Sequence, residues 1–133
     1  MKYLFLLCLP ALLIASGCLT SSVSTGSGET YRLKRSLNTF EVDVAGKLTE
    51  IHNAVQNGLR DLEISPIAQA DAFSAMTEAK FADETDFTIT LQATSPKVVK
   101  MKIRVGIKGD QARSEMLFKT IERHFPRGRF SVQ

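Results

Sequence analysis

The stretch TDFTITLQATSPKVVKMKIRVGI, residues 85–107, contains two runs in which apolar and polar side chains alternate. The apolar positions of the two runs are Phe87, Ile89, Leu91, Ala93 and Val99, Met101, Ile103, Val105, Ile107. A period of two is typical of a β-strand with one buried and one exposed face. Ser95 and Pro96 separate the runs and favour a turn. This stretch therefore predicts two antiparallel strands whose apolar sides face one core.

The sequence upstream extends the predicted sheet. Residues 75–81 alternate in the same way and are followed by a polar turn at 82–84, so three consecutive strands would form an antiparallel meander. Residues 30–39 also alternate and predict a first strand. Residues 63–72, interrupted by Pro66, are ambiguous and are compatible with the start of a further strand.

Two segments have the three- and four-residue apolar spacing of amphipathic helices. The first covers residues 44–62, with Asp43 as a candidate N-cap and Gly58 as a weakness near its end. The second covers residues 112–125 and is capped by Asp110. The predicted fold is α+β with the order β-α-β-β-β-α, a four-stranded, mainly antiparallel sheet with two helices packed on one face.

The N-terminus has the composition of an export signal. Residues 1–17 begin with Lys2 and continue with an apolar run at 3–14, which is shorter than the roughly 20 residues that span a bilayer. The run LIASGC, residues 13–18, resembles a bacterial lipobox. This resemblance implies cleavage before Cys18 and acylation of its thiol. The alternative is an ordinary secretory signal that is cut nearby and leaves Cys18 as a free thiol.

Composition divides the rest of the chain. Residues 18–29 would hold the acylated cysteine and a flexible Ser/Thr/Gly tether, residues 30–126 a single α+β domain, and residues 127–133 a C-terminal tail. By the proteobacterial sorting rule, Leu19, in place of an Asp, favours the periplasmic face of the outer membrane over the inner membrane in an organism with two membranes. We therefore expect a lipid-anchored protein of the cell envelope.

The charges predict one candidate contact surface. A net charge of +3 does not indicate a nucleic-acid partner. Lys100, Lys102 and Arg104 lie on one side of the last predicted strand, and Arg32 and Lys34 lie on the polar side of the first. If those strands are neighbours, five cations share one surface that could contact an anionic envelope polymer. The alternative is a solvated sheet face whose charges prevent aggregation.

The pattern around Gly106, Gly109 and Asp110 could suggest a phosphate-binding turn. It lacks the further glycines, the Lys-Ser/Thr pair and the parallel strand that such loops need. A tight turn from a strand into a helix capped by Asp110 explains these residues better.

Metal and catalytic sites have little support in the sequence. His52 and His124 are the two histidines, one in each predicted helix, whereas a zinc site usually needs three or four ligands. Asp83, Glu84 and Asp86 cluster in one turn but lack the spacing of a calcium loop. We therefore expect no catalytic residue, no cofactor and no metal.

The run KIRVGIKGDQARS, residues 102–114, precedes the second predicted helix. This run, Tyr31 in the first strand and the patterned helix after it are similar to a family of short bacterial lipoproteins of unknown function. The resemblance covers most of residues 30–125. It implies a fold and a location, and it carries no activity, ligand or catalytic residue to this chain.

These features predict a non-enzymatic envelope lipoprotein. Its domain would be a binding or structural module, tethered to the membrane through acyl chains on Cys18, that contacts an envelope protein or an anionic envelope polymer. The competing hypothesis is a small-ligand carrier or an enzyme with a pocket between sheet and helices. A filled interface between those layers would favour the first hypothesis, and a deep polar cavity the second.

Overall fold

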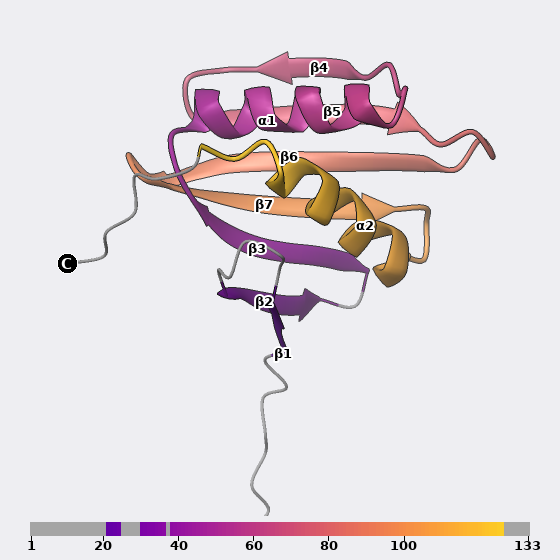
Figure 1. Cartoon of the computed structure of the whole chain (residues 1–133), viewed down its shortest axis with the longest axis horizontal. Helices are drawn as coiled ribbons and strands as arrows, with labels where there is room; N and C mark the ends of the chain where they lie inside the picture. Colours follow the sequence, from indigo (N-terminus) through magenta and orange to yellow (C-terminus); the bar gives the residue numbers. More distant parts are fainter. Residues whose placement is uncertain (1–20, 25–29, 37, 127–133) are drawn as a thin grey trace, which may run out of the picture.

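The computed structural model describes residues 21–24, 30–36 and 38–126. The predicted signal at 1–17, Cys18 and the predicted tail at 127–133 lie outside the described residues. The described part of the chain has an α+β fold in which one sheet is covered on one face by two helices (Figure 1). The predicted fold class is therefore confirmed.

The sheet is antiparallel throughout and, within the described residues, has seven strands rather than four. Its spatial order is β1-β2-β3-β7-β6-β5-β4. The strands are β1 (Ser21–Ser24), β2 (Thr30–Ser36), β3 (Thr39–Ala45), β4 (Ile67–Ala70), β5 (Ser74–Lys80), β6 (Asp86–Ser95) and β7 (Val98–Val105). The predicted meander corresponds to β5, β6 and β7, which pair in sequence order. The ambiguous segment before it supplies β4 at the sheet edge.

Strand β3 corrects the predicted start of the first helix. Val44 is not the first residue of a helical stripe, and Asp43 is not an N-cap, because residues 39–45 form a strand between β2 and β7. Phe40, Val42 and Val44 are buried in alternation with the more exposed acidic residues between them, which is a strand pattern. The helix begins only at Leu48. The predicted first strand accordingly ends at Ser36, and a turn leads into β3.

Strand β1 corrects the predicted tether. Ser21–Ser24 is not a flexible linker but pairs with β2 in antiparallel register, with Ser21 opposite Leu33 and Ser24 opposite Thr30. An edge strand can be held by backbone hydrogen bonds alone, because every residue except proline carries one donor and one acceptor. A serine-rich segment therefore joins a sheet without any apolar periodicity that would predict it.

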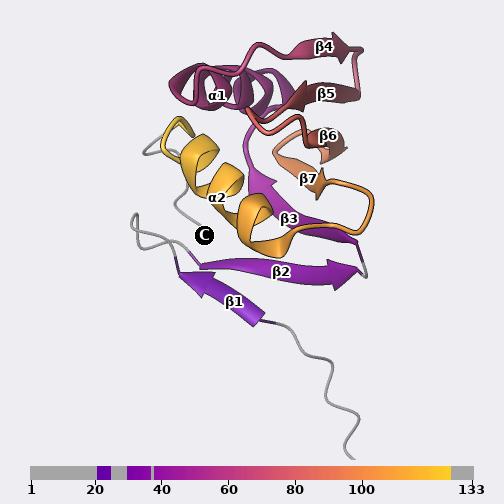
Figure 2. The same cartoon turned by 90° about the vertical axis from the view of Figure 1, so that its right-hand side faces the viewer.

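The two helices, α1 (Leu48–Asp61) and α2 (Gln111–Glu122), lie on the same face of the sheet (Figure 2). Helix α1 packs over β5, β6 and β7, while α2 packs over β7 and β3. The prediction that both helices cover one face is confirmed. The core between the layers is formed by side chains at most 3 % exposed, namely Phe40, Val42, Val44, Ile51, Ala54, Val55, Leu59, Ala75, Phe87, Ile89, Leu91, Val99, Met101, Ile103, Val105, Leu117, Phe118 and Ile121.

Gly58 lies where the two helices cross. A Cβ atom at this position would come within 2.9 Å of both Cα and Cγ1 of Ile121. Carbon atoms pack at about 3.5–4.0 Å, so the backbones can approach this closely only without a side chain on α1. The glycine that the sequence presents as a weakness in the helix is thus a requirement of helix packing.

We predict that Gly58→Ala destabilises the domain by about 1–3 kcal/mol, because the added methyl overpacks the crossing with Ile121. Helix propensity alone would give the opposite sign, a gain of up to about 1 kcal/mol. Asn53→Ala, at an exposed position of the same helix, is the matched control. Urea denaturation followed by circular dichroism measures both variants. Equal stability of the two variants would show that the crossing tolerates a methyl group.

Candidate functional site

The face of the sheet opposite the helices carries charged and polar side chains from several strands. We call this the open face. Register places its residues in rows across the strands, so that Lys102 lies between Glu41 on β3 and Thr90 on β6. Lys100 lies in the same way between Asp43 and Gln92. Neighbours in such a row have Cβ atoms about 5 Å apart, which is close enough to interact.

The five predicted cations do not lie on neighbouring strands. Arg32 and Lys34 belong to β2, whereas Lys100, Lys102 and Arg104 belong to β7, and β3 lies between the two strands. The condition on which the prediction of a basic surface depended is therefore not met. The two strands are separated by β3, whose last residues the sequence pattern predicts as the start of a helix.

Strand β3 adds acidic residues to the middle of the open face. Glu41 pairs in register with Lys34 on one side and with Lys102 on the other. The carboxylate oxygen Oε1 of Glu41 lies 3.4 Å from Nζ of Lys100, in an ion pair whose two side chains are mostly buried. Asp43 follows on the same face. The described part of this surface alternates in sign rather than being uniformly basic.

Apolar side chains mark the β4 edge of the open face. Ile67 is 69 % exposed and Met76 on β5 is 38 % exposed. Register pairs Ile67 with Glu78 and Met76 with Gln69, so the two apolar residues are diagonal neighbours on the open face. Exposed apolar groups that lie together beside charged residues are typical of protein contact sites. Sequence patterning missed this pair because β4 is too short to show a period.

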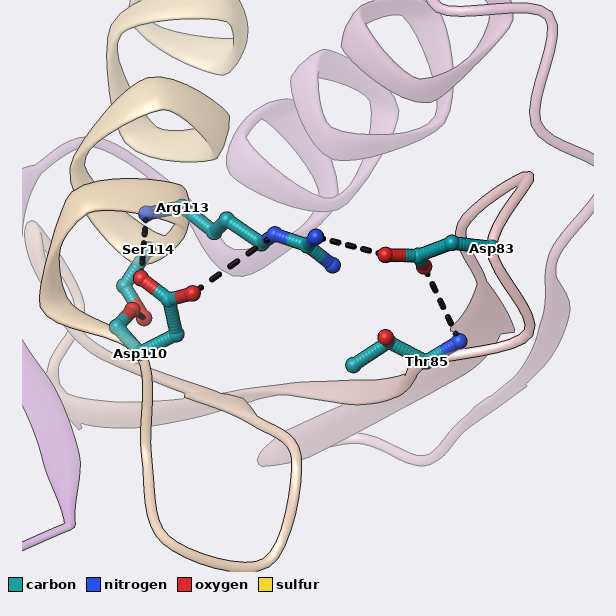
Figure 3. A network of polar contacts seen from close by, with 5 residues as sticks. All are labelled: Asp83, Thr85, Asp110, Arg113 and Ser114. Atoms are coloured by element: carbon teal, nitrogen blue, oxygen red, sulfur yellow. Dashed lines mark hydrogen bonds and ion pairs between the residues drawn. The ribbon is translucent and has the colours of Figure 1, made fainter.

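A polar network joins the turn before β6 to the start of α2 (Figure 3). The guanidinium of Arg113 donates to Asp83 Oδ2 at 2.5 Å, and its Nε lies 3.5 Å from Asp110 Oδ2. The guanidinium carbon also lies 5.1 Å from the ring centre of Phe81, within cation–π range. Asp83 and Arg113 are far apart in the sequence, and no spacing rule could have paired them.

The same network shifts two pKa values. The hydrogen bond from Arg113, together with the Thr85 hydroxyl and the Thr85 backbone N–H, holds the pKa of the Asp83 carboxyl well below its usual value. The hydrogen bond to Asp83 in turn raises the pKa of Arg113. Both effects stabilise the ionised forms, so the contact is a charged one at neutral pH.

The glycine-containing turn has the structural role that the sequence favours. Gly106 and Gly109 have φ angles of +66° and +74°, which suit glycine. A Cβ atom on Gly109 would lie 2.6 Å from the backbone oxygen of Asn38. The Asp110 carboxylate accepts a hydrogen bond from the backbone N–H of Arg113 at 3.0 Å, which confirms the predicted N-cap. The turn thus sets the direction of α2 and brings the start of this helix into contact with the β2–β3 connection.

His52 lies on α1, whereas His124 lies just after the end of α2, and the two make different contacts. His124 Nε2 lies 2.5 Å from Asp61 Oδ2, so this pair joins the last residue of α1 to the chain just after α2. Nδ1 of His52 is buried and has no hydrogen-bond partner within the described part of the chain. Among the residues that the structure describes, the two histidines do not belong to a common group of side chains that could hold a metal ion.

The acidic turn is occupied by ion pairs. Asp83 contacts Arg113, while Glu84 and Asp86 lie 3.8 Å and 3.6 Å from Nζ of Lys80. Across residues 21–24, 30–36 and 38–126, no group of three or more His, Cys, Asp or Glu residues is arranged to hold a metal ion.

Hollows in the described surface lie at the two ends of the sheet. At one end, a hollow of about 100 Å³ is bordered by Asn38, Phe40, Gly109 and Ser114. At the other end, a larger one of about 520 Å³ is bordered by Leu48, Phe73, Ala93, Pro96 and their neighbours. Core side chains fill the space between the described parts of sheet and helices.

Cys18 and the apolar segment before it lie outside the described residues, so their role stays a prediction. In the described part of the chain, neither helix has the length and hydrophobicity needed to cross a membrane.

The fold and open face define a small α+β domain whose helices cover one face of an antiparallel sheet and whose other face carries mixed charges. Comparison with protein families gives a match over residues 2–124 to the family model described as "Protein of unknown function (DUF3568)", and the chain belongs to this family. The predicted membership in a family of unknown function is confirmed at this level. A comparison with curated proteins finds no match.

We predict that Asp110→Ala lowers the free energy of unfolding by about 1 kcal/mol, because the N-cap of α2 is lost. Asp110→Asn keeps a side-chain oxygen for the N–H of Arg113 and should retain most of this stability. Thermal unfolding of the two variants beside the wild type measures the difference. An Asp110→Ala protein as stable as the wild type would show that the cap contributes nothing.

We predict that Asp83→Asn destabilises the domain at neutral pH and that the difference from wild type disappears in acid. A carboxyl whose pKa is lowered on folding contributes stability above its unfolded value, 3.8, and loses this contribution as pH falls toward its folded pKa. Urea denaturation of both proteins at pH 7 and at successively lower pH tests this. A difference that stays constant with pH would mean that the ion pair with Arg113 has no part in stability.

Proposed function

We propose that this protein is a membrane-tethered lipoprotein of the bacterial cell envelope, whose domain binds an envelope protein through its open face. The observation that carries the tether is Cys18 at the end of a signal-like segment with three small residues before it. The match to the family model begins at residue 2 and so includes this segment and Cys18. Two or more acyl chains would make the attachment effectively permanent. The periplasmic face of the outer membrane is the location that Leu19 favours.

The proposal of a protein partner follows from the charges of the open face. Three cations on β7, at positions 100, 102 and 104, lie among Glu41, Asp43 and Glu78. A uniformly anionic polymer would be attracted by the cations and repelled by the acids to a similar extent. A protein surface with both signs of charge can match this pattern, and such matching gives specificity.

The apolar pair Ile67 and Met76 gives this contact an anchor. Most of the binding energy in protein interfaces comes from a few apolar or aromatic side chains that become buried, while charged residues around them exclude wrong partners. The pair lies at the β4 edge, next to Glu78 and Gln69. A partner that covers the edge would bury both residues and still reach Lys102, which lies two strands from Met76 and three strands from Ile67.

The tether is tested by comparing the wild-type precursor with Cys18→Ala in cells. We expect wild-type protein in the membrane fraction, with the mass of two or more acyl chains on its N-terminal peptide. Cys18→Ala should appear in the soluble envelope fraction, because one substitution removes the acylation site. Mass spectrometry and fractionation measure the outcome. A wild-type protein without acyl mass would overturn the tether.

The contact is tested by photo-crosslinking in the same cells, with a photoreactive amino acid at position 76 on the open face or at position 116 on α2. Met76 and Met116 are 38 % and 41 % exposed, so they are matched in accessibility and differ in the face they occupy. We expect a discrete protein adduct from position 76 that is absent from position 116. Ile67→Asp should abolish it, since a charge then replaces the apolar anchor. Adducts of equal yield from both positions, or one that Ile67→Asp leaves unchanged, would contradict the assignment of the face.

A further inference from the structure

The loop from β7 to α2 presents an apolar side chain to solvent. Ile107 is 86 % exposed, between Gly106 and Gly109, whose positive φ angles make the chain turn there. The guanidinium of Arg104 donates to the backbone oxygen of Ile107 at 3.1 Å, and Lys108 follows directly. An exposed apolar tip with cationic neighbours suits the boundary between lipid headgroups and acyl chains.

The loop lies at the end of the sheet toward which β1 points when it is followed back toward the N-terminus. Strand β1 is antiparallel to β2, so going back along β1 from Ser24 to Ser21 leads toward Ser36, where β2 ends. The β2–β3 connection at that end touches the β7–α2 loop, because Asn38 lies against Gly109. Figures 1 and 2 both show the end of β2 and the β7–α2 loop at the same end of the sheet.

The register limits how far Cys18 can lie from this loop. Ser21 pairs with Leu33, Leu33 with Val42, and Val42 with Met101, so Ser21 lies at the level of Met101 along the strands. Cys18 is three residues earlier in the chain and therefore lies within about 10 Å of Ser21. Measured along the strands, Cys18 can therefore extend at most about 10 Å beyond Met101, which is the position of Arg104. The loop of residues 106–109 lies farther along β7 than this position and therefore projects beyond Cys18.

The four acidic side chains around this loop are matched in number by four cations, because two cations contact them and two more flank the loop. Asp83 and Asp110 contact Arg113, and Glu84 and Asp86 contact Lys80. Arg104 and Lys108 are the cations that flank the apolar tip itself.

From this geometry we infer that the β7–α2 loop is a second membrane contact, in which Ile107 enters the interface of the lipid leaflet that holds Cys18. This inference rests on the proposed acylation of Cys18. The acyl chains hold the domain at the surface, and the loop fixes which end faces the lipid. The strands then run away from the membrane, and the open face stays accessible from the side.

The test uses a fluorescent label at position 107 in the acylated protein. The sequence has two cysteines, Cys8 in the predicted signal and Cys18, so Ile107→Cys is the single free thiol after processing and acylation. Phe73→Cys is the matched control, since Phe73 is 75 % exposed and lies at the opposite end of the sheet, between β4 and β5. Each protein is labelled with an environment-sensitive dye and reconstituted into vesicles of phosphatidylethanolamine and phosphatidylglycerol.

We expect a shallow spin-labelled lipid to quench the dye at position 107 several-fold more than the dye at position 73, and aqueous iodide to show the reverse order. Equal access of iodide to both dyes in an acylated protein would overturn this inference and leave the proposed tether intact. Protection from iodide at position 107 without lipid quenching would assign the loop to a protein contact instead. Absence of acyl mass on Cys18 in the same sample would overturn the proposed function and this inference together.

Discussion

The direction in which α2 leaves β7 is the constraint on which the rest of the domain depends. Gly109 adopts a left-handed backbone angle against Asn38, Asp110 caps the first turn, and Arg113 reaches across to Asp83. These contacts send α2 diagonally over β7 and β3 and bring Ile121 against Gly58 of α1. Because the two helices together cover the apolar face of the sheet, an error in this turn would expose core residues of β3 and β7 at once.

Strand β3 links the core to the character of the open face. Its inner side buries Phe40, whose ring centre lies 5.4 Å from that of Phe118 on α2. Its outer side places Glu41 and Asp43 between β2 and β7. One strand thus completes the hydrophobic core and divides what would otherwise be one basic surface. The same alternation of side chains causes both effects, since successive residues of a strand point to opposite faces.

Under the proposed function, the helix-covered face, the end of the sheet with Ile107 and the open face have different roles. The helices cover one face of the sheet, and buried apolar side chains form a core between the described parts of the two layers. The exposed Ile107 lies at the end of the sheet toward which β1 points when it is followed back toward the N-terminus. Strand β6 is ten residues long and spans about 33 Å, so the far end of the sheet and the open face remain clear of a membrane at the anchored end. A short attachment and an accessible face are compatible in this geometry.

The amino-acid sequence by itself determined the α+β class, the meander of β5 to β7, the single helix-covered face and the cap at Asp110, because each has a local signature in period or residue type. It did not determine β1 or β4, which are held by backbone pairing along strands too short to show a period. It missed β3 because Val44 matched the helical spacing of the residues after it. Only the tertiary structure placed Glu41 beside Lys102, Asp83 beside Arg113 and Gly58 against Ile121. Such contacts depend on which segments become neighbours, and burial of the whole apolar face, rather than any local pattern, selects that arrangement.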